Sequence, residues 1–155
     1  MRLTKYKTRL TEEQRVTLEK EFSINRPDST SFIKSPNDVY EVARDGLRMH
    51  EESEEYLYMI CMNTKNKIIG VFEVSHGNVN SSIFGVREIL QKALLANAVS
   101  IIMIHTHPSG DPSPSREDVK VTERLSEAAK LVGIQLLDHI IVGEKYVSLK
   151  EKGYL

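Results

Sequence analysis

The pattern of hydrophobic and polar residues divides the chain into an irregular N-terminal stretch and a longer part in which helical and strand-like segments alternate. Residues 1–34 are polar and weakly patterned. Within them, Thr11-Glu12-Glu13-Gln14 has the form of a capping box, which predicts a short helix that ends near Phe22. The segment 26–31 is typical of a turn or linker. We therefore expect a polar N-terminal extension with one short helix.

From Ser35 onward, the pattern predicts a single α/β domain over residues 35–155. Ser35 as N-cap and Pro36 at the first helical position begin a helix that ends near the acidic run 51–55, which we interpret as a solvated helix end and turn. Two strands follow, at about 55–62 and 67–75. The four-residue turn between them favours an antiparallel hairpin.

The remaining segments continue the alternation of helices and strands. Residues 86–96 and 115–131 repeat apolar positions at helical spacing, and the run 99–104 is continuously apolar, as in a buried central strand. The last strands are expected at 134–142 and 146–149. Strands that alternate with helices indicate an α/β domain with a sheet covered by helices.

Composition narrows the class of protein. The 155 residues suffice for one hydrophobic core, and the net charge of −1 argues against binding nucleic acid mainly by electrostatics. Cys61 is the only cysteine, which excludes an internal disulfide or a four-cysteine metal cluster, and its apolar strand indicates an inert core residue. No segment has the roughly 20 apolar residues of a membrane span, and no secretory signal is expected at the N-terminus, which is basic and polar. A cytoplasmic location without a membrane partner is expected.

The richest chemistry lies directly after the predicted central strand. His105 and His107 are two residues apart, so their side chains share one face of the strand. After seven intervening residues, 108–114, Ser115 and Asp118 begin the next predicted helix. Two imidazoles and a carboxylate are ligands that bind zinc and leave a position open for water. We therefore predict one Zn²⁺ per chain, held by His105, His107 and Asp118.

Simpler interpretations exist for each part of this pattern. Ser115 and Asp118 also form a good helix cap, and strand-end histidines often only make hydrogen bonds. The joint occurrence of the two histidines, the proline-rich loop and the Ser-x-x-Asp helix start has no shared structural reason, and it favours the metal site.

A three-ligand zinc site also needs a general base. Glu73, between Phe72 and Val74 on a predicted strand, is our candidate. From the pattern alone, it could equally lie on the solvent face of an edge strand. Glu88 and Glu117 are weaker candidates because each is expected on a solvated helix face. His139, within a predicted strand, is interpreted as a core residue or a supporting residue rather than a ligand.

These residues resemble a known family. The set Glu73, His105-x-His107 and Ser115-x-x-Asp118 is similar to the JAMM motif of JAB/MPN metallopeptidases, and 107–115 and 137–143 resemble its RadC branch. The resemblance implies a cytidine-deaminase-like α/β fold with a mixed sheet flanked by helices. It also implies a catalytic zinc, Glu73 as general acid/base and Ser115 as a hydrogen-bond donor to the oxyanion.

Two departures from the family pattern and two further functions stay open. Thr106 stands where the family usually has Asn, and the N-terminal stretch lacks the helix-hairpin-helix segment of full-length RadC-like proteins. The leading hypothesis is a zinc peptidase or isopeptidase whose substrate is unknown. The alternatives are a DNA repair or recombination accessory protein that uses the basic N-terminus, and a metal-free interaction module. A zinc nucleobase deaminase is excluded because its ligand set needs two cysteines. Nothing in the sequence indicates an oligomeric state.

Overall fold

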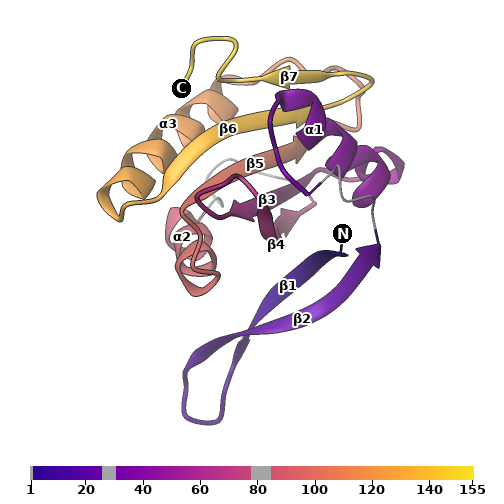
Figure 1. Cartoon of the computed structure of the whole chain (residues 1–155). Coiled ribbons are helices and arrows are strands. Elements are labelled where there is room, and N and C mark those ends of the chain that lie inside the picture. Colours follow the sequence, from indigo (N-terminus) through magenta and orange to yellow (C-terminus); the bar gives the residue numbers. More distant parts are fainter. Residues whose placement is uncertain (1, 26–30, 78–84) are drawn as a thin grey trace.

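The computed structural model describes residues 2–25, 31–77 and 85–155 and contains a seven-stranded mixed sheet in the order β2-β1-β4-β3-β5-β6-β7 (Figure 1). The strands are β1 (Arg2–Leu10), β2 (Val16–Asn25), β3 (Tyr56–Met62), β4 (Ile68–His76), β5 (Ser100–Thr106), β6 (Gln135–Val142) and β7 (Tyr146–Ser148). The helices are α1 (Pro36–Glu41) with a π-helical turn η2 (Val42–Gly46) and a 3-10 turn η3 (Met49–Glu51), α2 (Val86–Leu95) and α3 (Arg116–Leu131). The predicted α/β class is confirmed.

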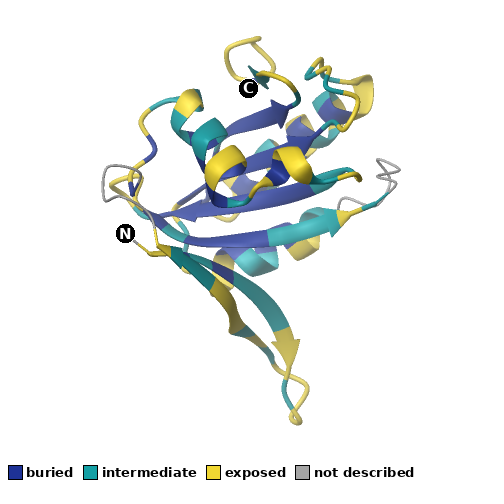
Figure 2. Cartoon of the chain, turned by 90° about the vertical axis from the view of Figure 1, so that its right-hand side faces the viewer, coloured by how far each residue is buried: buried dark blue, intermediate teal, exposed yellow. Residues whose placement is uncertain are grey.

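Each face of the sheet carries its own hydrophobic core. Because successive strand residues point to opposite faces, Ile102 and Ile104 of β5 pack with the segment that contains α1, whereas Ile101 and Met103 pack against α2 and α3. The central strands are therefore buried on both sides, as Figure 2 shows. Cys61 is fully buried in the second core, and burial raises the pKa of its thiol to about 12, which fits the expected inert residue.

The register of the central strands decides which strand ends lie together at one edge of the sheet. β3 runs antiparallel to β5, with Leu57 opposite His105, and β5 runs parallel to β6, with His105 opposite Ile141. The beginning of β3 and the ends of β5 and β6 consequently lie side by side. The loops that leave this edge carry the chemistry predicted from the sequence.

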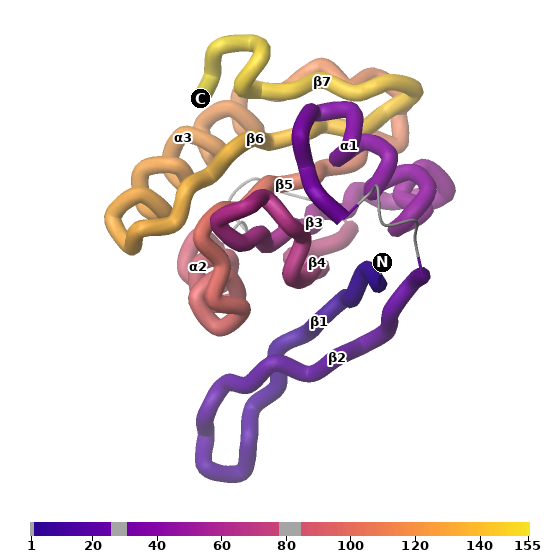
Figure 3. The backbone as a smooth tube through the Cα atoms, viewed as in Figure 1, coloured from indigo at the N-terminus to yellow at the C-terminus, as the bar shows by residue number. Residues whose placement is uncertain are grey.

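The predicted helix over 11–22 is wrong. β1 and β2 form an antiparallel hairpin instead, and β1 joins the main sheet by a short parallel pairing in which Lys5 lies opposite Val71. The hairpin extends well beyond the other strands (Figure 3). The N-terminal extension is thus a continuation of the sheet. Of the linker predicted at 26–31, only Ser31 lies within the described residues.

The physical reason for this difference lies in Thr11 and in the residues after the turn. The Thr11 hydroxyl accepts a hydrogen bond from the backbone N–H of Arg15, and Gln14 adopts a left-handed conformation with φ of 61°. The supposed capping box therefore closes a hairpin turn. Apolar residues then alternate with polar ones, a period of two that favours a strand. They are Val16, Leu18, Phe22 and Ile24.

The later elements follow the predicted pattern closely. The β3–β4 hairpin is antiparallel, and α3 is followed by Gly133 in a left-handed conformation with φ of 75°. Among the described helices, none is long and apolar enough to cross a membrane.

Candidate metal centre

Two histidines lie where β5 ends. His105 is the penultimate residue of the strand and is 3% exposed, and His107 follows the strand and is half-buried. Their ring centroids are 4.8 Å apart, and the ring planes are nearly perpendicular, at 86°. Because Leu57 opposite His105 belongs to the α2–α3 core, the His105 ring points to the side of the sheet that α3 covers.

Asp118 approaches these rings from the first turn of α3. Its Oδ1 lies 3.1 Å from Nδ1 of His105, and its Oδ2 lies 3.7 Å from Nε2 of His107. Burial opposes a charged carboxylate, but the interactions with His105, His107 and Ser115 hold the pKa of Asp118 well below its usual range. Asp118 is therefore a buried anion between two imidazoles.

Ser115 caps the same helix and orients this carboxylate. Its hydroxyl donates to Oδ2 of Asp118 at 2.7 Å and accepts from the Asp118 backbone N–H at 3.1 Å, while the Ser115 N–H donates to the same Oδ2 at 2.7 Å. The result is a complete capping box. The interpretation of Asp118 as part of a helix cap is compatible with its position beside the histidines, because the same carboxylate makes both sets of contacts.

The loop after β5 fixes the tautomer of His107. Its Nδ1 lies 2.8 Å from the backbone carbonyl oxygen of Asp111. A carbonyl only accepts, so Nδ1 carries a proton, and in the neutral ring Nε2 keeps its lone pair. The carboxylate of Asp118 beside Nε2 raises the pKa of His107. Nε2 is the atom that faces Asp118. This arrangement, in which one imidazole nitrogen is held by a carbonyl and the other points to the site, is typical of metal-binding histidines.

Gly110 and Gly143 allow this loop to pack closely on the β6–β7 turn. A Cβ on Gly143 would lie 2.2 Å from the carbonyl oxygen of Gly110, a distance that real side chains do not tolerate. The Glu144 N–H donates to the same carbonyl at 2.8 Å. The position of the loop that carries His107 therefore depends on a glycine from a distant part of the chain.

Glu55 is the carboxylate that sequence reasoning missed. It directly precedes β3, and its Oε2 lies 3.6 Å from Nε2 of His105. One ligand atom each from Glu55, His105 and His107 lie within 4.8 Å of one another, so this group could hold a metal ion. The acidic run 51–55 concealed Glu55, and the signal that could have found it is its place at the start of the strand beside β5.

The structure does not bring Glu73 to this cluster. Glu73 lies opposite Tyr58, whose side chain belongs to the α1 core, so it points to the other face of the sheet from His105. Its carboxylate binds Nζ of Lys5 at 2.7 Å and Nδ1 of His76 at 2.8 Å. Burial opposes the charge of Glu73, yet these two partners keep its pKa below the usual value. Glu73 thus anchors the N-terminal hairpin.

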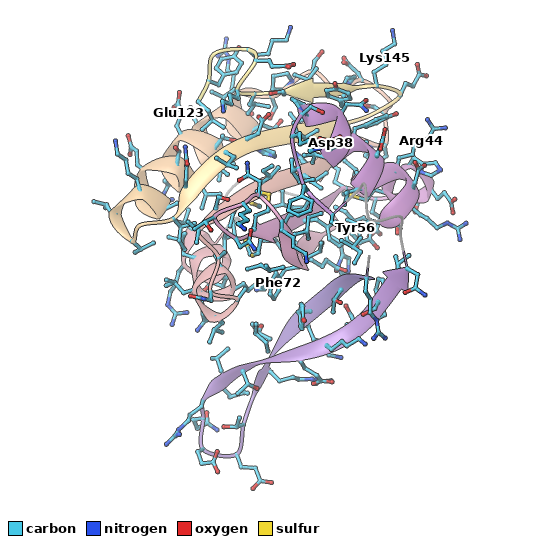
Figure 4. The ribbon with its side chains drawn as sticks, in the orientation of Figure 1. Asp38, Arg44, Tyr56, Phe72, Glu123 and Lys145 are labelled. Carbon is cyan, nitrogen blue, oxygen red and sulfur yellow. The ribbon has the colours of Figure 1, made fainter. Side chains whose placement is uncertain are left out.

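Thr106, between the two histidines, also points to the α1 face. Its Oγ1 accepts a hydrogen bond from the backbone N–H of Tyr56 at 2.8 Å. Tyr56 lies at the start of β3, near the middle of the molecule in Figure 4. The bond ties the end of β5 to the residue next to Glu55, and so it holds both sides of the cluster in register.

The donor set fits zinc. Two imidazoles and two carboxylates are nitrogen and oxygen ligands of the kind that catalytic zinc takes from proteins. Oε2 of Glu55 lies 3.6 Å from Nε2 of His105, whereas Oδ1 of Asp118 lies 3.1 Å from Nδ1 of the same ring, so Glu55 groups with the two histidines and Asp118 borders that group. The residues present are therefore suited to a zinc ion with an open position.

A pocket of about 470 Å³ lies beside this cluster. His107 forms part of its wall, together with the loop after β5, the segment from α1 to η3 and the β6–β7 turn. Its charged lining residues are of both signs, namely Arg44, Glu52 and Glu144. Arg44 projects outward at the edge of the molecule (Figure 4). Of the clustered groups among the described residues, only His107 lines this pocket, so the pocket reaches the cluster from the side of His107.

Comparison with known proteins places this geometry in a family. The sequence model of the RadC-like JAB domain matches residues 33–154, the part that contains the sheet from β3 to β7 and the whole cluster. The chain belongs to the RadC-like JAB domain family. This finding confirms the predicted RadC-like branch of the JAB/MPN family.

Named relatives of this RadC-like JAB domain carry the designation UPF0758. A UPF0758 protein of Methanosarcina barkeri is 50% identical over 124 residues, which cover 79% of this chain and 53% of the relative. One of Clostridium acetobutylicum is 45% identical over 137 residues, 88% of this chain and 59% of that protein. One of Bacillus pumilus is 46% identical over 129 residues, 83% and 57% respectively. The chain therefore spans little more than half the length of these relatives.

Proposed function

We propose that this chain is a zinc-dependent hydrolase of amide bonds, with a peptide or isopeptide as substrate. The observation that carries the proposal is the convergence of His105, His107, Asp118 and Glu55 at one edge of the sheet. Three of these groups suffice to hold a catalytic zinc, and the fourth is then available for proton transfer.

We assign zinc binding to His105, His107 and Asp118. The side chains of His105, His107 and Asp118 are only 3%, 14% and 5% exposed, and the last is fixed by Ser115. Such buried and oriented groups hold their geometry without a metal, which favours them as ligands. When bound, zinc supplies a Lewis acid that polarises a carbonyl and lowers the pKa of water from 15.7 to roughly 7.

We assign the role of general acid/base to Glu55 and no longer to Glu73. The side chain of Glu55 is 39% exposed, so its carboxylate has access to solvent while it lies beside His105. In the reaction, its Oε2 would take a proton from the attacking water and then deliver it to the leaving amine nitrogen. Each proton transfer of this kind contributes typically about 10²–10⁴-fold to the rate.

Ser115 keeps its proposed place as hydrogen-bond donor to the oxyanion. In this structure its hydroxyl hydrogen points to Oδ2 of Asp118. Once that carboxylate is engaged by a cation, the hydroxyl can turn its hydrogen toward a developing negative charge nearby. Ser115 would then both orient a ligand and stabilise the transition state.

The DNA accessory function gains no separate support. The basic N-terminus that motivated it consists of Arg2, Lys5, Lys7 and Arg9 in β1. All but the first are paired with carboxylates of the hairpin or of β4. The pairs are Lys5 with Glu21 and Glu73, Lys7 with Glu19, and Arg9 with Glu19. Paired cations release fewer counterions on binding phosphate, so we do not propose this function.

The test compares two glutamate variants that differ only in position, Glu55→Gln and Glu73→Gln. Zinc content is measured in each purified protein after dialysis against trace zinc, and hydrolysis is measured on a library of fluorogenic peptides and isopeptide-linked lysine substrates. We expect Glu55→Gln to keep its zinc and to lose about 10²–10⁴-fold in turnover. Glu73→Gln should keep both properties, since its carboxylate faces the other side of the sheet.

Two results would contradict the proposal. The zinc assignment is wrong if the purified wild-type chain takes up no stoichiometric zinc. The role of Glu55 is wrong if its Gln variant hydrolyses every substrate that the wild type hydrolyses at the same rate.

A further inference from the structure

His139 is a buried histidine beside the metal centre that the proposed mechanism does not use. It lies in β6, is 2% exposed, and its ring is 6.1 Å from that of His105 with the planes 28° apart. Because its register partner Met103 belongs to the α2–α3 core, His139 points to the same side of the sheet as His105. Its ring thus lies beside that of His105, within the core that α3 covers.

A short chain of hydrogen bonds links His139 to Asp118. Nδ1 of His139 lies 2.6 Å from Oγ1 of Thr122, and this hydroxyl lies 2.6 Å from the backbone carbonyl oxygen of Asp118. The carbonyl can only accept, so the single hydroxyl hydrogen of Thr122 goes to Asp118. Nδ1 of His139 must then carry a proton and donate it to Thr122. Burial lowers the pKa of His139 to about 3, which keeps the ring neutral.

The surroundings of this pair are otherwise apolar. Leu57, Met103 and Leu125 line a cavity of about 10 Å³ with Thr122 and His139. Nε2 of His139 has no hydrogen-bond partner among the described residues. A leucine or valine would fill such a position with less loss of hydration. Two polar side chains in this place therefore lower stability, and a cost of this kind is often associated with function.

The position of the pair indicates what it does. Asp118 is held at its carboxylate by Ser115, one residue before α3, and at its backbone by Thr122, one helical turn later. His139 connects that turn to β6, the strand that pairs with β5, in which His105 lies and which His107 follows. The contact between Thr122 and His139 therefore fixes the distance between α3 and the sheet next to the proposed metal ligands.

We propose that Thr122 and His139 are positioning residues that set the zinc affinity of the centre by holding the first turn of α3 against β6. This inference rests on the proposed zinc site and extends it to two residues that contact no metal. Groups that support metal ligands typically change affinity or activity by about 10–100-fold when they are replaced.

The test measures zinc affinity of the full chain by competition with a chromophoric chelator, and the absorption spectrum of the Co²⁺-loaded protein. We expect Thr122→Val to weaken zinc binding by about 10–100-fold and to change the Co²⁺ spectrum, whereas Thr122→Ser restores both. His139→Leu should weaken zinc binding to a similar extent. Urea unfolding of the chelated proteins reports stability separately.

The double variant Thr122→Val/His139→Leu separates positioning from stability. It removes both polar groups together, so no donor is left unpaired, and the chelated protein should be at least as stable as the wild type. Its zinc affinity should nevertheless stay low. If the two residues acted only through stability, the double variant would recover zinc affinity together with stability.

Three control variants complete the design. Thr4→Val removes a part-buried hydroxyl contact to Ser23 in the N-terminal hairpin and should leave zinc affinity unchanged. Ile134→Val lowers stability from within the α2–α3 core and leaves the hydrogen bonds among His139, Thr122 and Asp118 unchanged. Glu123→Gln alters the neighbour of Thr122 that points to solvent from the same helix (Figure 4).

The outcomes distinguish this inference from the proposed function. If the wild type binds zinc tightly and Thr122→Val and the double variant bind it equally well, the positioning role is wrong and the metal centre stands. If Ile134→Val lowers zinc affinity as much as Thr122→Val, then Thr122 and His139 act only through stability, and the inference is overturned. If the wild type binds neither Zn²⁺ nor Co²⁺, the proposed function fails, and this inference fails with it.

Discussion

Helices α1 and α3 begin with the same chemical motif, and only one of them forms part of a site. In α1, Ser35 and Asp38 form a capping box in which Oδ2 of Asp38 accepts the backbone N–H groups of Lys34 and Ser35. In α3, Ser115 and Asp118 form the same box. Asp118, however, is 4% exposed and lies against two histidines, whereas Asp38 is only half-buried and caps its helix. The comparison teaches that Ser-x-x-Asp specifies a helix start, and that the preceding strand decides whether the carboxylate gains further chemistry.

The largest difference between the two caps should come from removing the carboxylate charge. We expect Asp118→Asn to abolish stoichiometric zinc binding and hydrolysis, because it replaces one of three proposed ligands. Asp38→Asn should keep full zinc content. Metal analysis of the two purified variants decides this, and equal zinc content in both would mean that the caps do not differ in function.

The gain in stability on binding zinc should require Asp118 of the α3 cap and should not require Asp38 of the α1 cap. A ligand that binds the folded state at 100 times its Kd stabilises it by about 2.7 kcal/mol. We expect a gain of this size on adding zinc to the wild type and to Asp38→Asn, and none in Asp118→Asn. Urea unfolding with and without a chelator measures it, and a zinc-dependent gain in Asp118→Asn would place the ion elsewhere.

The two serines provide a finer comparison. Ser115→Ala removes the hydroxyl that orients Asp118, so zinc affinity should fall by about 10–100-fold. Ser35→Ala should not change it. A chelator competition assay on both variants is sufficient, and unchanged affinity in Ser115→Ala would show that the backbone alone orients the carboxylate.

The smallest effect is expected in the absence of metal, where the difference between the caps should disappear. In chelated protein, Ser115→Ala and Ser35→Ala each lose one side-chain cap, which costs about 1 kcal/mol of unfolding free energy. Urea unfolding of the two chelated variants should therefore give similar losses. A much larger loss at Ser115 would indicate that the cap region is under strain without its cation.

The second half of the fold could be predicted because each signal there was local. The apolar run before His105, the proline-rich loop and the cap at Ser115 each specify one element, and the structure contains all of them. The hairpin over 2–25 was missed because one local signal, the apparent capping box at Thr11, was given more weight than the period-two pattern after Val16. Short polar segments often satisfy two local rules, and long-range pairing with β4 decides between them.

Glu55, the proposed general base, could not be found from the sequence for a different reason. Glu55 directly precedes β3 and Glu73 lies in the adjacent strand β4, and which of them reaches the histidines depends on strand order and register, which are tertiary properties. Glu73 stood out because an acid between apolar neighbours is unusual. Its actual partner is the buried Lys5, 68 positions earlier in the chain, and no local pattern reveals such a pairing.

The close packing of Gly143 on Gly110 has a consequence for how this family can diverge. The absence of a side chain at one turn permits the backbone path of another turn that carries His107, so substitutions at the two positions cannot accumulate independently. A descendant that acquires even a methyl group at position 143 must first rebuild the loop at position 110. The two turns therefore form one evolutionary unit, although 32 residues separate them in the chain.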